Sequence, residues 1–163
     1  MTLRQKFAAV VDVVALLVAS GCTHAELHGE VIRVIDGDTV DVLVDSHPVR
    51  IRLAQIDAPE HDQPFGTRSK QQLAAFIYRR NVSVEEAGHD RYRRTIGTIF
   101  VDGKDVNREM VAVGMAWAFR RYLTDPHVLE LERVARVARR GLWIDPAPVA
   151  PWVWRHRRVR ITH

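Results

Sequence analysis

Apolar and polar residues alternate along the first half of the chain with the period of β-strands. Valine and isoleucine recur with polar residues between them over 28–35 and 39–44, and residues 49–53 alternate strictly between apolar and basic side chains. Two further segments, 81–86 and 95–101, have the same character. This pattern predicts five strands, with the third ending before Pro59, because proline cannot continue a β-ladder.

Helical periodicity replaces the strand pattern in three places. Residues 66–80 place apolar side chains on one face, and a second helix is predicted from Asp105 through Trp117. A third helix is predicted to start at Asp125 and Pro126, because aspartate is a favoured N-cap and proline a favoured first helical residue.

The order of these elements is three strands, one helix, two strands and two helices. This order is typical of an OB-type barrel, so we predict an α+β fold: a five-stranded OB-type β-barrel with three α-helices. The length of 163 residues indicates one domain with short extensions. We assign the domain to residues 26–144 and a basic tail containing proline and tryptophan to 145–163. The tryptophans of this tail are expected to attach it to the domain, and its arginines to be solvated.

The N-terminal segment has the pattern of a targeting signal. Basic residues precede an apolar run at 7–18, which is too short for a comfortable membrane span. We expect residues 1–25 to direct export to the periplasm or the extracellular space. Cleavage after Ala25 and lipid attachment at Cys22 both remain open, with membrane attachment only in the second case. An uncleaved amphipathic helix is the alternative.

Composition and missing motifs exclude some classes of catalytic site but do not identify the function. The hydrophobic fraction of 47% and the charged fraction of 27% are ordinary for a globular protein. A formal net charge of +4 is compatible with an anionic partner but does not require one. Cys22 is the only cysteine, so no disulfide can form within the chain. The sequence also lacks HExxH, CxxC, a glycine-rich phosphate loop and a nucleophile elbow, which argues against zinc and serine-hydrolase chemistry.

Carboxylates gather at the predicted strand ends and turns. Asp38 and Asp57 offer the oxygen ligands that a hard cation such as calcium prefers, if the barrel brings their two turns together. Glu60 follows on the same turn as Asp57 and could act as general base toward a water molecule. Arg52 and Arg94 lie on or beside strands, and arginine suits the charge that develops on a phosphate in hydrolysis.

Each of these residues also has a purely structural interpretation. Asp-Gly is a common hairpin turn, which on its own favours a structural role for Asp36 and Asp38. Asp41 and Asp45 are interpreted as exposed strand positions without a role in the site. Only the combination of metal ligands, base and two arginines makes a phosphodiesterase site the preferred hypothesis.

The combination resembles the staphylococcal-type thermonuclease family. The resemblance rests on VIDGDT at 34–39, RIRLAQIDAPE at 50–60, DRYRRT at 90–95 and DVN at 105–107. It covers about residues 28–143. It implies a secreted, calcium-dependent nuclease on an OB-type barrel, which cleaves DNA and RNA endonucleolytically and leaves 3′-phosphate ends.

The resemblance also implies a role for individual residues. Calcium would be bound by Asp38, Asp57 and the backbone carbonyl of Ala58, at a position where the family often has threonine. Asp36 would order metal-bound water, and Glu60 would orient or deprotonate the attacking water. The scissile phosphate would be held by Arg52 and Arg94. Tyr92 and Tyr122 are candidates for substrate binding, with packing at the rim of the barrel as the alternative.

One motif departs from the family pattern. The family has Tyr-Gly-Arg where this chain has Tyr92-Arg93-Arg94. Arg93 could force a different turn or compete with Arg94 for the phosphate. A second hypothesis is therefore a catalytically weak or inactive barrel that binds nucleic acid or protein. For the first hypothesis we expect a monomer that needs no protein partner.

Overall fold

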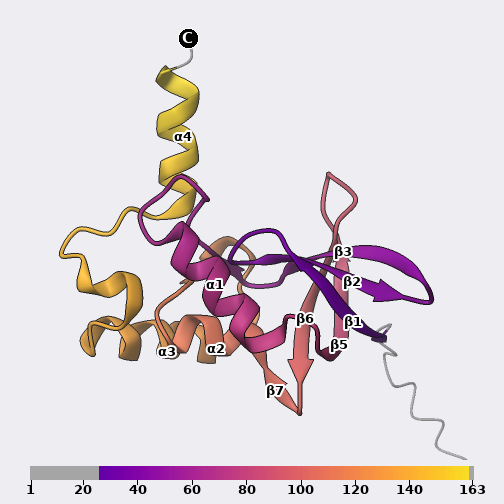
Figure 1. The fold of residues 1–163 in the computed structure, drawn as a ribbon. Coiled ribbons are helices and arrows are strands. Elements are labelled where there is room, and N and C mark those ends of the chain that lie inside the picture. The colour runs from indigo at the N-terminus through magenta and orange to yellow at the C-terminus, as the bar shows by residue number, and fades with distance from the viewer. Residues whose placement is uncertain (1–25, 162–163) are drawn as a thin grey trace, which may run out of the picture.

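The computed structural model describes residues 26–161, and it is built around a closed β-barrel (Figure 1). The barrel strands are β1 (Glu26–Val34), β2 (Thr39–Val44), β3 (His47–Leu53), β5 (Asn81–His89) and β6 (Thr95–Val101). Antiparallel neighbours follow the order β3-β2-β1-β5-β6, and a parallel pairing of β3 with β6 closes the barrel. The prediction of an α+β fold with a five-stranded barrel is confirmed. The predicted export signal lies outside the described residues.

Helices and short strands surround this barrel. The helices are α1 (Gly66–Ile77), α2 (Val106–Ala112), α3 (Pro126–Val137) and α4 (Pro151–Ile161), with 3-10 turns η1 (Arg120–Tyr122) and η2 (Gly141–Ile144). The short strands are β4 (Ile56–Asp57), β7 (Lys104–Asp105) and β8 (Trp117–Ala118). Between residues 26 and 161, none of the helices combines the length and the apolar character needed to span a membrane.

Two helix starts follow the local sequence, and two helix ends do not. The side chains of Asp105 and Asp125 accept hydrogen bonds from the first turns of α2 and α3, as predicted. The helix predicted to reach Trp117 ends at Ala112, because Gly114 has a left-handed φ of 73°. Likewise the first helix ends at Ile77 rather than at residue 80.

The tail forms a fourth helix, which was not predicted. Its attachment is aromatic: the ring of Trp152 on α4 stacks on Phe119, with centroids 5.7 Å apart. The preceding loop is held by Gln63, whose Nε2 donates to the carbonyl of Val149 at 2.6 Å. In Figure 1, α4 projects from the rest of the chain beside the loop that leads into α1. The tail therefore lies next to the segment that carries Asp57 and Glu60.

Candidate active site

The Asp36-Gly37-Asp38 turn connects β1 to β2 and lies against α1. The backbone N–H of Asp38 donates to Oδ1 of Asp36 at 3.0 Å, which fixes the two carboxylates relative to each other. A Cβ on Gly37 would lie 1.9 Å from Oγ of Ser69, so only glycine permits this approach to α1. The glycine thus serves tertiary packing as well as the turn.

Asp57 reaches the same region from a short strand outside the barrel sheet. It lies on β4, which pairs with β8, and its side chain is about 1% exposed. Arg52 supports the bend before it: Nη1 donates to the carbonyls of Leu53 at 2.7 Å and Ile56 at 2.9 Å. The end of β3 and the short β4 strand therefore position Asp57 inside the protein.

The carboxylates of Asp38 and Asp57 converge on one nitrogen. Nη2 of Arg52 lies 3.2 Å from Oδ2 of Asp38 and 3.0 Å from Oδ1 of Asp57. The backbone N–H of Ala58 donates to Oδ2 of Asp38 at 2.7 Å, which brings the Ala58 main chain into the same cluster. Calcium prefers carboxylate and carbonyl oxygens as ligands, so the carboxylates of Asp38 and Asp57 and the carbonyl of Ala58 fit the predicted ion.

The predicted set of calcium ligands has to include a main-chain oxygen. Over residues 26–161, no group of three or more histidine, cysteine, aspartate or glutamate side chains is arranged to hold a metal. Two aspartates with the carbonyl of Ala58 are compatible with that finding. The three residues remain predicted ligands.

Burial shifts the pKa values of two aspartates of the site, Asp36 and Asp57. Burial raises the pKa of Asp57, and the hydrogen bond from Arg155 opposes this effect. Burial, together with the charge of Asp38, raises the pKa of Asp36 to about 7. The supporting role of Asp36 stays a prediction.

Glu60 is bound by an arginine that the sequence did not indicate. Nη1 of Arg155 lies 2.6 Å from Oε1 of Glu60, and Nη2 lies 2.7 Å from Oδ2 of Asp57. The side chain of Glu60 is about one-third exposed, so it remains reachable from solvent. The expectation that the arginines of the tail are solvated is wrong for Arg155. No local pattern reveals this contact, because 98 residues separate Arg155 from Asp57.

Arg94 immediately precedes β6, whose first residue, Thr95, pairs with Ile51 of β3. Its Nε donates to Oδ2 of Asp90 at 2.7 Å. It lines a hollow of about 520 Å³ with five other residues: Asp41, Pro48, Arg50, Tyr92 and Arg93. Arg93 has a φ of 64°, the left-handed conformation that glycine adopts easily. The chain turn is thus formed without the family glycine, and Arg94 still faces the hollow.

The two candidate tyrosines lie in different places. Tyr92 is 65% exposed and lines the hollow beside Arg94. Tyr122 lies on η1, is 58% exposed and packs its ring edge-on against Phe119 with centroids 5.0 Å apart. Tyr92 therefore has the better position for a nucleotide next to Arg94, and both substrate roles remain predictions.

Asp41 is buried, and the interpretation as an exposed position is wrong. It is 7% exposed and accepts Nε of Arg50 at 2.8 Å and Nε of Arg33 at 3.0 Å. The hydrogen bond from Arg50 is the main cause that holds its pKa below the usual range. β2 lies between β1 and β3, and an arginine from each neighbour covers the carboxylate. Asp45 is exposed, as predicted.

Two further buried polar residues hold the segments around Asp57. The side chain of Asn107 accepts from the backbone N–H of Ile99 and donates to the carbonyls of Ala54 and Gly97. Glu132 accepts from the backbone N–H of Ala118 in β8 at 2.7 Å. Sequence patterns did not single out Glu132, because its position on α3 has no local signal for burial.

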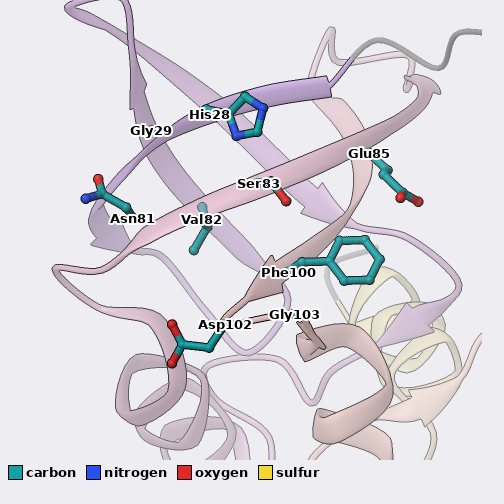
Figure 2. Close-up of a pocket in the computed structure, with 9 residues that line it drawn as sticks. All are labelled: His28, Gly29, Asn81, Val82, Ser83, Glu85, Phe100, Asp102 and Gly103. Atoms are coloured by element: carbon teal, nitrogen blue, oxygen red, sulfur yellow. The ribbon is translucent and has the colours of Figure 1, made fainter.

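A second hollow lies on the barrel wall away from these residues. It encloses about 700 Å³ and is lined from β1, β5, β6 and the Asp102-Gly103 turn (Figure 2). His28, Ser83 and Phe100 are among its lining residues, and none of the predicted site residues is. The candidate site is therefore the carboxylate cluster at the end of β3. Arg94 and Tyr92 line a hollow that shares no lining residue with this cluster, so the structure does not bring Arg94 into contact with it over the described residues.

A barrel with two buried aspartates joined by an arginine, and a glutamate close by, has the groups that a metal-assisted phosphodiesterase uses. Comparison with known proteins identifies the family. Residues 50–145 match the family described as staphylococcal nuclease homologue. The chain therefore belongs to the staphylococcal nuclease family and is a nuclease enzyme.

Relatives that match over most of their length include two that are named as nucleases. The chain is 51% identical to "Protein ParB" of Escherichia coli over 86% of each chain. It is 43% identical to "Micrococcal nuclease" of Shigella flexneri over 91% of each chain. An "Uncharacterized endonuclease" of Escherichia coli O157:H7 is 44% identical over 82% of this chain and 88% of its own.

Proposed function

We propose that this nuclease is an exported, calcium-dependent endonuclease that hydrolyses phosphodiester bonds of DNA and RNA and leaves 3′-phosphate ends. The observation that carries the proposal is the convergence of Asp38 and Asp57 on Arg52, with Glu60 beside them through Arg155. Export is inferred from residues 1–25 alone. A monomer without a protein partner is sufficient, because one chain supplies all of these groups.

The mechanism assigns the chemistry to side chains of this chain. Bound calcium would supply a positive charge that stabilises the negative charge gained by the phosphate. Glu60 accepts a proton from the attacking water, whose oxygen then bonds to phosphorus. Arg52 and Arg94 orient the phosphate and stabilise its added charge. The bond from phosphorus to the 5′ oxygen breaks, the 5′ oxygen takes up a proton from solvent to become a hydroxyl, and the phosphate stays on the 3′ oxygen.

A catalytically weak or inactive barrel that binds nucleic acid or protein stays the alternative. It rested on Arg93, whose left-handed φ shows that the turn forms without glycine. Arg93 lines the same hollow as Arg94, so its competition for the phosphate still motivates this alternative. The predicted ligands, base and arginines are all present in the sequence, which favours hydrolysis as the proposed function.

The products of cleavage test the proposed reaction. Internally positioned cuts are expected in end-labelled single-stranded DNA and RNA, since the mechanism uses only the phosphate and its two oxygens. The fragments should carry 3′-phosphate and 5′-hydroxyl ends, measured by mass spectrometry and by labelling with a polynucleotide kinase that lacks phosphatase activity. Stepwise shortening from one end, or 5′-phosphate products, would contradict the proposal.

A further inference from the structure

Arg155 contacts two carboxylates that have separate predicted tasks. Its guanidinium meets both oxygens of Asp57, with Nη2 at 2.7 Å from Oδ2 and Nη1 at 3.2 Å from Oδ1. Nη1 also lies 2.6 Å from Oε1 of Glu60. Bidentate pairing of this kind is the strongest that arginine makes with a carboxylate. The guanidinium of Arg155 on α4 thus forms ion pairs with the predicted metal ligand Asp57 and with the predicted base Glu60 at the same time.

The carboxylate of Asp57 is fully engaged by arginines. Oδ1 also accepts Nη2 of Arg52 at 3.0 Å, and the side chain is about 1% exposed. A divalent cation that coordinates this carboxylate would lie within a few ångströms of the Arg155 guanidinium, where two positive charges repel each other. Arg155 and the cation therefore compete for Asp57, whereas Arg52 is fixed by the barrel.

The helix that carries Arg155 is attached mainly at its start. In its first turn Trp152 packs against Trp117 and Phe119. Nε1 of Trp154 lies 3.4 Å from Oδ1 of Asp62, a long hydrogen bond. The rest of α4 projects outward in Figure 1. The side chain of Arg155 is 43% exposed, so its guanidinium can turn toward solvent without a change in the barrel.

We propose that Arg155 is an internal competitor of calcium, so that α4 holds Asp57 and Glu60 in an inhibited arrangement and calcium binding displaces the guanidinium. This inference rests on the proposed function, because it assumes that calcium binds at Asp57. It assigns α4 a regulatory role: the tail sets how much calcium the nuclease needs. The same displacement frees Glu60 to accept a proton.

The test is a calorimetric titration of the full chain with calcium, comparing Arg155→Gln with Arg157→Gln. Arg157 is an exposed arginine on the same helix, so its replacement removes the same charge without removing the contact. Arg155→Gln should bind calcium about 5- to 150-fold more tightly than Arg157→Gln, the range typical of coupled binding events. Circular dichroism should show that both variants are folded.

The outcomes separate this inference from the proposed function. Equal affinities, or weaker binding by Arg155→Gln, would overturn the competition while leaving the calcium site in place. An absence of binding in all proteins would overturn both the calcium site and the competition. A second readout is tryptic cleavage after Arg155 in the unmodified chain, followed by mass spectrometry. Calcium should accelerate it, and an unchanged rate at saturating calcium would contradict displacement.

Discussion

Replacing Glu60 with glutamine is expected to lower kcat for DNA cleavage by about 10²- to 10⁴-fold, the usual contribution of a positioned general base. Glutamine keeps the size of the side chain but cannot accept a proton from the attacking water. The side chain is about one-third exposed, and its backbone N–H is held by Oε1 of Gln63. We therefore expect stability to change little, while the chemical step slows.

A matched control distinguishes catalysis from loss of charge. Glu130 is an exposed glutamate on α3 that pairs with Arg133, and Glu130→Gln removes the same charge away from the site. Its kcat should stay close to that of the unmodified protein. Rates are compared at saturating substrate and calcium. If Glu60→Gln keeps more than about a tenth of the original kcat, well above the range for loss of a general base, Glu60 is not the base.

Replacing Arg52 with alanine is expected to lower both kcat and the free energy of unfolding. Removal of a group that stabilises the transition state typically costs about 10²- to 10³-fold in kcat. Arg52 also neutralises Asp38 and Asp57, which are both nearly inaccessible to solvent. Loss of one partner of a buried ion pair costs about 3–5 kcal/mol of the free energy of unfolding. Arg52 is therefore expected to contribute both to the stability of the fold around Asp38 and Asp57 and to the rate of hydrolysis.

The two losses are measured separately, by urea unfolding and by rate at a temperature where the variant is folded. Arg33→Ala is the control, because Arg33 lies on β1 and pairs with Asp41 rather than with the site carboxylates. We expect Arg33→Ala to keep most of the activity. Arg52→Lys retains the charge without the planar fork, and it should recover stability more than rate. An Arg52→Ala variant with normal rate and normal stability would contradict both assigned roles.

The parts of the fold that local chemistry specifies were predictable from the sequence. Strand alternation located β2 and β6 at Thr39–Val44 and Thr95–Val101, and aspartate caps located the starts of α2 and α3. The site carboxylates were proposed from motifs on the turns at the ends of those strands, and their roles from the family resemblance. The structure brings Asp38, Asp57 and Arg52 together. The strand positions and helix starts depend on neighbours within a few residues along the chain.

The features that were missed depend on contacts distant in sequence. α4 lacks an apolar stripe, and it is held by Trp152 on Phe119 and by Arg155 on Asp57. Asp41 has the pattern of an exposed position, yet arginines from two neighbouring strands bury it. Strand alternation identifies the two faces of a strand, but it does not say what covers the polar face.

Digestion of supercoiled plasmid by the chain, in calcium or in EGTA, tests the central claim most directly. The Asp38 and Asp57 carboxylates converge on one point, so cleavage should depend on a bound hard cation. We predict nicking and linearisation in calcium, no cleavage in EGTA, and full recovery when calcium is added back in excess. Cleavage that continues in EGTA, or folded protein that does not cleave in calcium, would contradict the account.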